Sequence, residues 1–136
     1  MRDNFVRWFL LTVILLTIAM AASAAETRME KTSPGGSLVV VTFADAPLKT
    51  MTETPFKIEL TGPSDKVIKD AKFNLSLDMP AMPMPPNHPK VAWQGDAYHG
   101  VAVFTMAGAW QVFVNIQRPG YDQEQVVFDI EEVLMK

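Results

Sequence analysis

The residues best suited to chemistry are methionines and a histidine gathered in one proline-rich segment, residues 78–89. Met79, Met82 and Met84 are interspersed with prolines, and His88 follows shortly after them. Thioethers are soft, neutral ligands that suit Cu(I) and need not lose a proton before binding, and imidazole binds copper in either oxidation state. This combination predicts a copper site carried by a loop.

The prolines restrict how these ligands can meet. The prolines between Pro80 and Pro89 exclude a helix and cannot donate to a sheet ladder, so they favour a stiff polyproline geometry. In that geometry Met79 and Met82 lie about 9 Å apart on one face. A shared metal therefore requires the loop to bend, or requires ligands from elsewhere in the chain.

Two further candidate ligands, His99 and Met106, lie in one predicted strand that spans residues 98–106. An odd number of residues separates them, so a regular strand points their side chains to opposite faces. Both can face one metal only if a bulge intervenes.

The methionines also have a purely structural interpretation. Methionine is a flexible side chain that fills irregular gaps and packs well on aromatic rings such as those of Trp93 or Trp110. The same side chains could therefore plug the open end of a β-sandwich, and the residue pattern alone leaves both interpretations open.

The elements that must position this segment are short strands bounded by turn residues. Phe56, Ile58 and Leu60 alternate with polar residues, and Trp110 begins a longer alternating run. The predicted strands are residues 37–44, 55–61, 71–78, 90–94, 98–106, 109–117 and 125–133. About seven short strands with a turn roughly every ten residues predict an all-β, immunoglobulin-like antiparallel β-sandwich.

Five residues in the second half of the domain carry specific expectations. The dipeptide Ala107-Gly108 permits a sharp reversal, which would bring Phe104 and Trp110 into the core on either side of it. Gly100, within a predicted strand, indicates a bulge or a close approach of another group.

Residues 1–24 have the composition of an export signal. Arg2 and Arg7 precede an apolar run, and Ala22-Ser23-Ala24 fits the small-x-small pattern before a cleavage site. We expect a signal peptide with cleavage after Ala24. The alternative is an uncleaved membrane anchor helix, because residues 8–25 carry no charge. Either way, the rest of the chain is expected in the periplasm or another extracytoplasmic space.

The remaining chain is predicted to comprise a polar linker, residues 25–36, and one domain, residues 37–136. The chain of 136 residues has a net charge of −3, which provides no basic footprint for nucleic acid. It has no cysteine, so disulfides and thiolate chemistry are excluded and an apolar core must supply the stability. No catalytic triad, nucleophile elbow, zinc motif or phosphate loop is present, so no enzymatic activity is expected.

The pattern Met-Pro-x-Met-Pro-Met-Pro-x-x-His, residues 79–88, followed by Tyr98-x-Gly100 and Phe104-x-Met106-x-Gly108-x-Trp110, resembles the YtkA-like domain family. FixH-like proteins look similar. The resemblance covers about residues 37–130 and implies an exported or membrane-tethered immunoglobulin-like sandwich without enzymatic activity. It also implies metal contact by Met79, Met82, Met84, His88 and Met106.

The resemblance further implies partners. FixH-like proteins are associated with a copper-transporting pump and with assembly of copper-containing cytochrome oxidase, so metal-transport or oxidase-assembly membrane proteins are the expected partners. FixH-like proteins keep their membrane helix, whereas this chain has a cleavage motif, so direct membrane contact is expected only if residues 1–24 are retained.

Two functions are therefore expected from the sequence. In the first, the chain is an accessory protein that binds or passes Cu(I) through its Met/His-rich loop. In the second, it is a metal-independent interaction module of a cell-envelope or membrane complex, whose methionines adapt to the shape of a partner.

Overall fold

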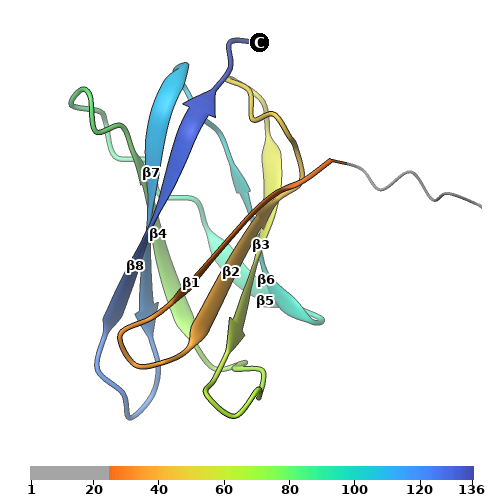
Figure 1. The fold of residues 1–136 in the computed structure, drawn as a ribbon, viewed down its shortest axis with the longest axis vertical. Coiled ribbons are helices and arrows are strands. Elements are labelled where there is room, and N and C mark those ends of the chain that lie inside the picture. The colour runs from red at the N-terminus through yellow and green to blue at the C-terminus, as the bar shows by residue number, and fades with distance from the viewer. Residues whose placement is uncertain (1–24) are drawn as a thin grey trace, which may run out of the picture.

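The computed structural model describes residues 25–136, which form eight strands and no helix (Figure 1). The strands are β1 (Thr27–Thr32), β2 (Leu38–Phe43), β3 (Thr54–Thr61), β4 (Lys72–Asp78), β5 (Val91–Gln94), β6 (Ala97–Ala102), β7 (Gly108–Gln117) and β8 (Glu124–Val133). Within this part of the chain no helix is available to cross a membrane. The predicted signal or anchor helix, residues 1–24, lies outside the described residues.

The strands form two antiparallel sheets. The larger sheet has the order β1-β2-β3-β6-β5 and the smaller one has the order β4-β7-β8. The all-β, antiparallel prediction is therefore confirmed, with eight strands in place of about seven. Because β4 belongs to the smaller sheet, the chain crosses between sheets after β3, and it returns to the larger sheet through the Met/Pro-rich segment that precedes β5.

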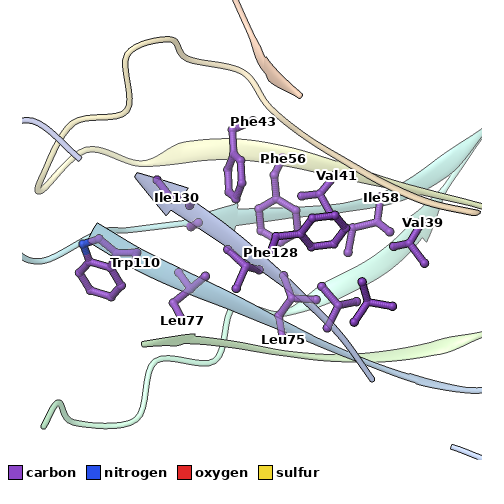
Figure 2. Packing of buried hydrophobic residues seen from close by; sticks show 14 of the residues in the cluster. Val39, Val41, Phe43, Phe56, Ile58, Leu75, Leu77, Trp110, Phe128 and Ile130 are labelled. Carbon is purple, nitrogen blue, oxygen red and sulfur yellow. The ribbon is translucent and has the colours of Figure 1, made fainter. Parts of the chain in front are cut away.

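One hydrophobic core lies between the two sheets, which gives a β-sandwich-like arrangement. Figure 2 shows side chains of β2 and β3, including Val41 and Ile58, directed toward Leu75 of β4 and Phe128 of β8. The alternation of apolar and polar residues along β7 puts every second side chain into this core. Burying each such side chain stabilises the fold by about 1.5–3 kcal/mol.

The aromatic residues around the predicted reversal are core residues, as expected. Phe104 is fully buried and Trp110 is 1% exposed, and their rings meet edge to face with centroids 5.3 Å apart. The indole Nε1 of Trp110 donates a 2.9 Å hydrogen bond to the carbonyl of Met106, which closes the loop between β6 and β7. Gly108 has a φ of 124°, a conformation that favours glycine.

Strand β1 lies in the segment predicted as a linker, residues 25–36. It pairs with β2 along its whole length, from Thr27 opposite Phe43 to Thr32 opposite Leu38. As an edge strand, β1 contributes only the half-buried Met29 to the core. It therefore lacks the alternation of apolar and polar residues that marks a strand in a sequence. Lys31 Nζ donates a 2.7 Å hydrogen bond to the carbonyl of Val127, which ties β1 to β8 of the other sheet.

Strand β6 ends at Ala102, earlier than the predicted end at residue 106. Ala102 pairs with Thr54, the first residue of β3, so β3 offers no partner beyond it. The expectation of a close approach at Gly100 is confirmed, because a Cβ there would collide with the ring of Phe56 and the carbonyl of Lys90.

Tyr98 of β6 fixes the connection between the two sheets. Its hydroxyl donates a 2.8 Å hydrogen bond to the carbonyl of Ile68 and accepts one of 3.1 Å from the amide of Ala71. Its ring meets those of Phe73 and Trp93 edge to face. Burial raises the pKa of Tyr98 above its ordinary value of 10.0, because the interior disfavours the phenolate.

Candidate functional site

The Met/Pro-rich segment runs back along the free edge of β4, and Asn87 holds it there. The amide of Leu77 donates a 2.9 Å hydrogen bond to the Asn87 carbonyl, and the Asn87 side-chain Nδ2 donates one of 3.0 Å to the carbonyl of Val103. One residue therefore ties the segment both to β4 and to the loop between β6 and β7. The side chain of Asp78 accepts a 2.8 Å hydrogen bond from the amide of Met79 at the point where the segment leaves β4.

Met79 is a core residue. It is only 6% exposed, and its Cε lies 3.2 Å from the position that a Cβ on Gly108 would take. Met84 is half-buried and packs against the same core. For Met79 the gap-filling interpretation of the sequence therefore matches the structure.

Met82 and Met106 are accessible, with 42% and 41% of their surfaces exposed. Met82 follows a turn in which its amide approaches the carbonyl of Met79 at 3.4 Å. Met106 lies in the loop between β6 and β7, whose Val103 carbonyl is bonded to Asn87. The two thioethers thus belong to two loops that are hydrogen-bonded to each other.

His88 is held with one ring nitrogen occupied. Its Nδ1 lies 3.0 Å from the carbonyl oxygen of Leu75. A carbonyl oxygen can only accept, so Nδ1 carries the proton, and in the neutral ring Nε2 keeps its lone pair. Histidines that bind metals commonly have this arrangement, in which the second N–H donates to a backbone carbonyl and sets the orientation of the ring.

His99 stands apart from these residues. It lies on β6 opposite Lys57 of β3 and Ala92 of β5, and its side chain is on the outer face of the larger sheet, away from the core-facing Tyr98. Its Nε2 is 3.6 Å from a carboxylate oxygen of the exposed Asp96. The strand placement thus separates His99 from the Met/Pro-rich segment.

Two methionines that the sequence pattern did not single out lie at the same end of the molecule. The amide of Met51 donates a 2.8 Å hydrogen bond to the carbonyl of Phe104, two residues before Met106. The neighbouring Thr50 hydroxyl approaches the sulfur of Met135 at 3.9 Å. Met51 and Met135 are 65% and 77% exposed, and only the tertiary hydrogen bonds reveal their place, because they are far from residues 78–89 in the sequence.

All the exposed methionines among residues 25–136 therefore lie at one end, where β2, β4, β6 and β8 end and β3 and β7 begin (Figure 1). We call this the methionine end, formed by Met51, Met82, Met106 and Met135. His88 lies beside Leu75, three residues before the end of β4. Within residues 25–136 there is no group of three or more His, Asp or Glu side chains arranged to hold a metal ion.

Comparison with known proteins gives one match. Residues 31–115 match the family model described as YtkA-like. The matched region contains the whole Met/Pro-rich segment, His88, Met51 and Met106, whereas Met135 lies beyond it. No curated protein and no solved structure matches the chain.

Proposed function

Because the chain belongs to the YtkA-like family, we propose that it is an exported, non-enzymatic accessory protein that binds Cu(I) through His88 and the methionine end and passes it on. We also propose that its two facing sheets form an immunoglobulin-like sandwich. In this proposal copper is cargo, and the recipients are metal-transport or oxidase-assembly proteins of the membrane. The export-signal composition of residues 1–24 supports a periplasmic or other extracytoplasmic location.

The orientation of His88 is the observation that carries this proposal. A histidine at the surface usually keeps both ring nitrogens free to exchange partners, whereas Nδ1 of His88 is committed to the Leu75 carbonyl. The neutral ring therefore presents Nε2 as its only free donor to a metal. Because Asn87 anchors the backbone beside it, this presentation costs little conformational entropy on binding.

The accessible thioethers supply donors of the right softness. Met82 and Met106 are exposed on loops that are tied together by the bond from Asn87 to Val103. Neutral sulfur ligands suit Cu(I) and persist where a thiol would oxidise to a disulfide. They also leave the ion accessible to a recipient protein, which suits transfer better than storage. Met79 is excluded from the donor set, since its side chain is committed to the core.

The test is a competition titration with the chromogenic Cu(I) chelator bicinchoninate under anaerobic, reducing conditions. The variant Met82→Ile/Met106→Ile/His88→Gln should lose affinity about tenfold or more, equivalent to about 1.4 kcal/mol. Met29→Ile is the matched control, because Met29 is half-buried on β1 and is not part of the methionine end. Equal and weak competition by the wild type and the triple variant would exclude the copper function.

A second candidate is the metal-independent interaction module, and the exposure of Met82 and Met106 favours it. Large apolar side chains that are accessible on neighbouring loops offer an adaptable contact surface. For this function, the immobilised wild-type protein should retain a partner from solubilised cell envelope, and a copper chelator should not change that retention. The double variant Met82→Glu/Met106→Glu should no longer retain the partner. Loss of retention on chelation would instead favour the copper function.

A further inference from the structure

The opposite end of the molecule contains a cavity of about 640 Å³. Three turns enclose it: the β1–β2 turn, the β3–β4 connection and the β7–β8 turn, all at the lower end in Figure 1. Its volume lies in the range of small-molecule sites. Pro34, Pro63, Ile68 and the ring of Tyr121 contribute apolar surface to its lining.

The charged side chains that line this cavity differ in whether they have hydrogen-bond or ion-pair partners. Lys66, Arg118, Asp122 and Glu124 all line it. The carboxylate of Glu124 accepts hydrogen bonds from the Ser33 hydroxyl, at 3.2 Å, and from the backbone amide of Gly35. Among the ion pairs of residues 25–136, none includes Lys66 or Arg118. The two cations and the two carboxylates sum to zero net charge, but Glu124 is already held by neutral donors of the β1–β2 turn, whereas neither cation has an ion-pair partner among the described residues.

Arg118 is prepared for an anionic partner. Its Cζ lies 4.0 Å from the centroid of the Tyr121 ring, so the guanidinium is stacked in one orientation. Its Nε is buried and has no hydrogen-bond partner among the described residues. A carboxylate ligand would bind the guanidinium through charge-assisted hydrogen bonds.

The walls of the cavity are fixed by their own hydrogen bonds. The amide of Ser33 donates to the carbonyl of Ser37 at 2.7 Å, and the amide of Gly62 donates to the carbonyl of Lys66 at 2.9 Å. The amide of Tyr121 donates to the carbonyl of Arg118 at 3.2 Å, which forms the turn that carries both residues. A preorganised cavity loses little entropy when a ligand enters.

We propose that this cavity binds a small organic monocarboxylate with an apolar body. The carboxylate pairs with Arg118 and Lys66, and the apolar body lies against Tyr121 and the two prolines. A single carboxylate can be shared by these two cations, which have no ion-pair partner among the described residues. The site is independent of the methionine end, which lies at the other end of both sheets, so the copper proposal can fail without affecting it.

The probe is 3-phenylpropionate, titrated into ¹⁵N-labelled protein and followed by amide chemical shifts. Shifts should be confined to residues 33–37, 62–68 and 118–124, with a dissociation constant on the order of 1 mM or tighter. Arg118→Lys keeps the charge but removes Nε and the planar fork, so affinity should fall about fivefold or more. Arg28→Lys, at an exposed ion pair on β1, is the matched control and should bind as the wild type does.

Two further ligands and one further variant complete the test. The neutral 3-phenylpropionamide and inorganic phosphate should each bind about fivefold more weakly than 3-phenylpropionate, because one lacks the charge and the other lacks the apolar body. Lys66→Gln, at an exposed position, should also weaken binding of 3-phenylpropionate. This variant tests the proposal independently if Arg118→Lys does not fold. Absence of shifts in the three turns, or equal binding of the amide or of phosphate, would overturn the proposal.

Discussion

The imidazole Nδ1 of His88 and the carbonyl oxygen of Leu75 are 3.0 Å apart, although the two residues belong to different segments of the chain. The Leu75 carbonyl is directed away from the β7 ladder, and the amide of Leu77, two residues on, also points to this side and bonds to Asn87. The segment that carries the candidate ligands is thus bound to β4 by the same alternating groups that a further strand would use.

The hydrogen bond of His88 predicts its tautomer. At a pH at which the ring is neutral, the proton should reside on Nδ1, because the Leu75 carbonyl has no proton to donate. Long-range ¹H–¹⁵N correlation spectra of the two histidines should show Nδ1 of His88 in the protonated range and Nε2 in the unprotonated range. Addition of Cu(I) should move the Nε2 resonance. A proton on Nε2 of His88 would contradict the arrangement.

The burial of Met79 predicts a contrast in stability with Met82. Met79→Ala should lower the free energy of unfolding by about 2–5 kcal/mol, because it leaves a cavity in the core. Met82→Ala removes an exposed side chain and should change it by less than about 0.5 kcal/mol. Urea unfolding followed by tryptophan fluorescence measures both. Equal costs for the two variants would show that Met79 does not pack in the core.

Gly108 should tolerate no side chain. Alanine there must adopt a φ of 124° and place its Cβ 3.2 Å from the Met79 Cε, so Gly108→Ala should destabilise the fold by about 1–3 kcal/mol. Gly95→Ala is the control, since Gly95 also has a positive φ, of 71°, but has open space around it. The loss in the free energy of unfolding should be larger for Gly108→Ala than for Gly95→Ala. The reverse order would show that contact with Met79 does not cause the loss.

Tyr98→Phe should cost about 1–3 kcal/mol in the free energy of unfolding, because the Ile68 carbonyl and the Ala71 amide both lose their partner. The raised pKa of Tyr98 adds a pH dependence. Unfolding lets the phenol ionise at its ordinary pKa of 10.0, whereas the folded state resists ionisation up to a higher pH. The contribution of Tyr98 is therefore complete below pH 10.0 and is lost as the pH rises through the raised pKa.

Thermal unfolding across alkaline pH measures this effect. The fall in stability above pH 10.0 should be smaller in Tyr98→Phe than in the wild type. Tyr121→Phe removes the other tyrosine of the chain, which is exposed, and should leave the fall in place. An unchanged fall in Tyr98→Phe would assign the alkaline loss to other groups.

The strands that contribute most to the core were predictable from the sequence. Strand β7 alternates cleanly because one face is buried by the other sheet and the other face meets solvent, and its predicted bounds, 109–117, differ from the observed Gly108–Gln117 by one residue. Strand β1 was not predictable, because an edge strand with a single core-facing methionine carries no periodic signal. The end of β6 depends on where β3 begins, which is a property of pairing and not of the residues of β6.

The candidate site was predictable only in part. The pattern of residues 79–88 identified the segment, but it could not separate the buried Met79 from the exposed Met82, because each is followed by a proline. Met51 and the cavity at the other end depend on contacts between distant segments. The position of His99 on an outer sheet face follows from strand register, which the sequence pattern does not determine.

The smaller sheet has both of its margins engaged. At β8 the ammonium of Lys31 holds the Val127 carbonyl, and at β4 the groups of Leu75 and Leu77 are held by His88 and Asn87. An extended chain that approaches either margin finds hydrogen-bonding groups already taken. At these positions the smaller sheet is less open to strand addition by another copy of the chain.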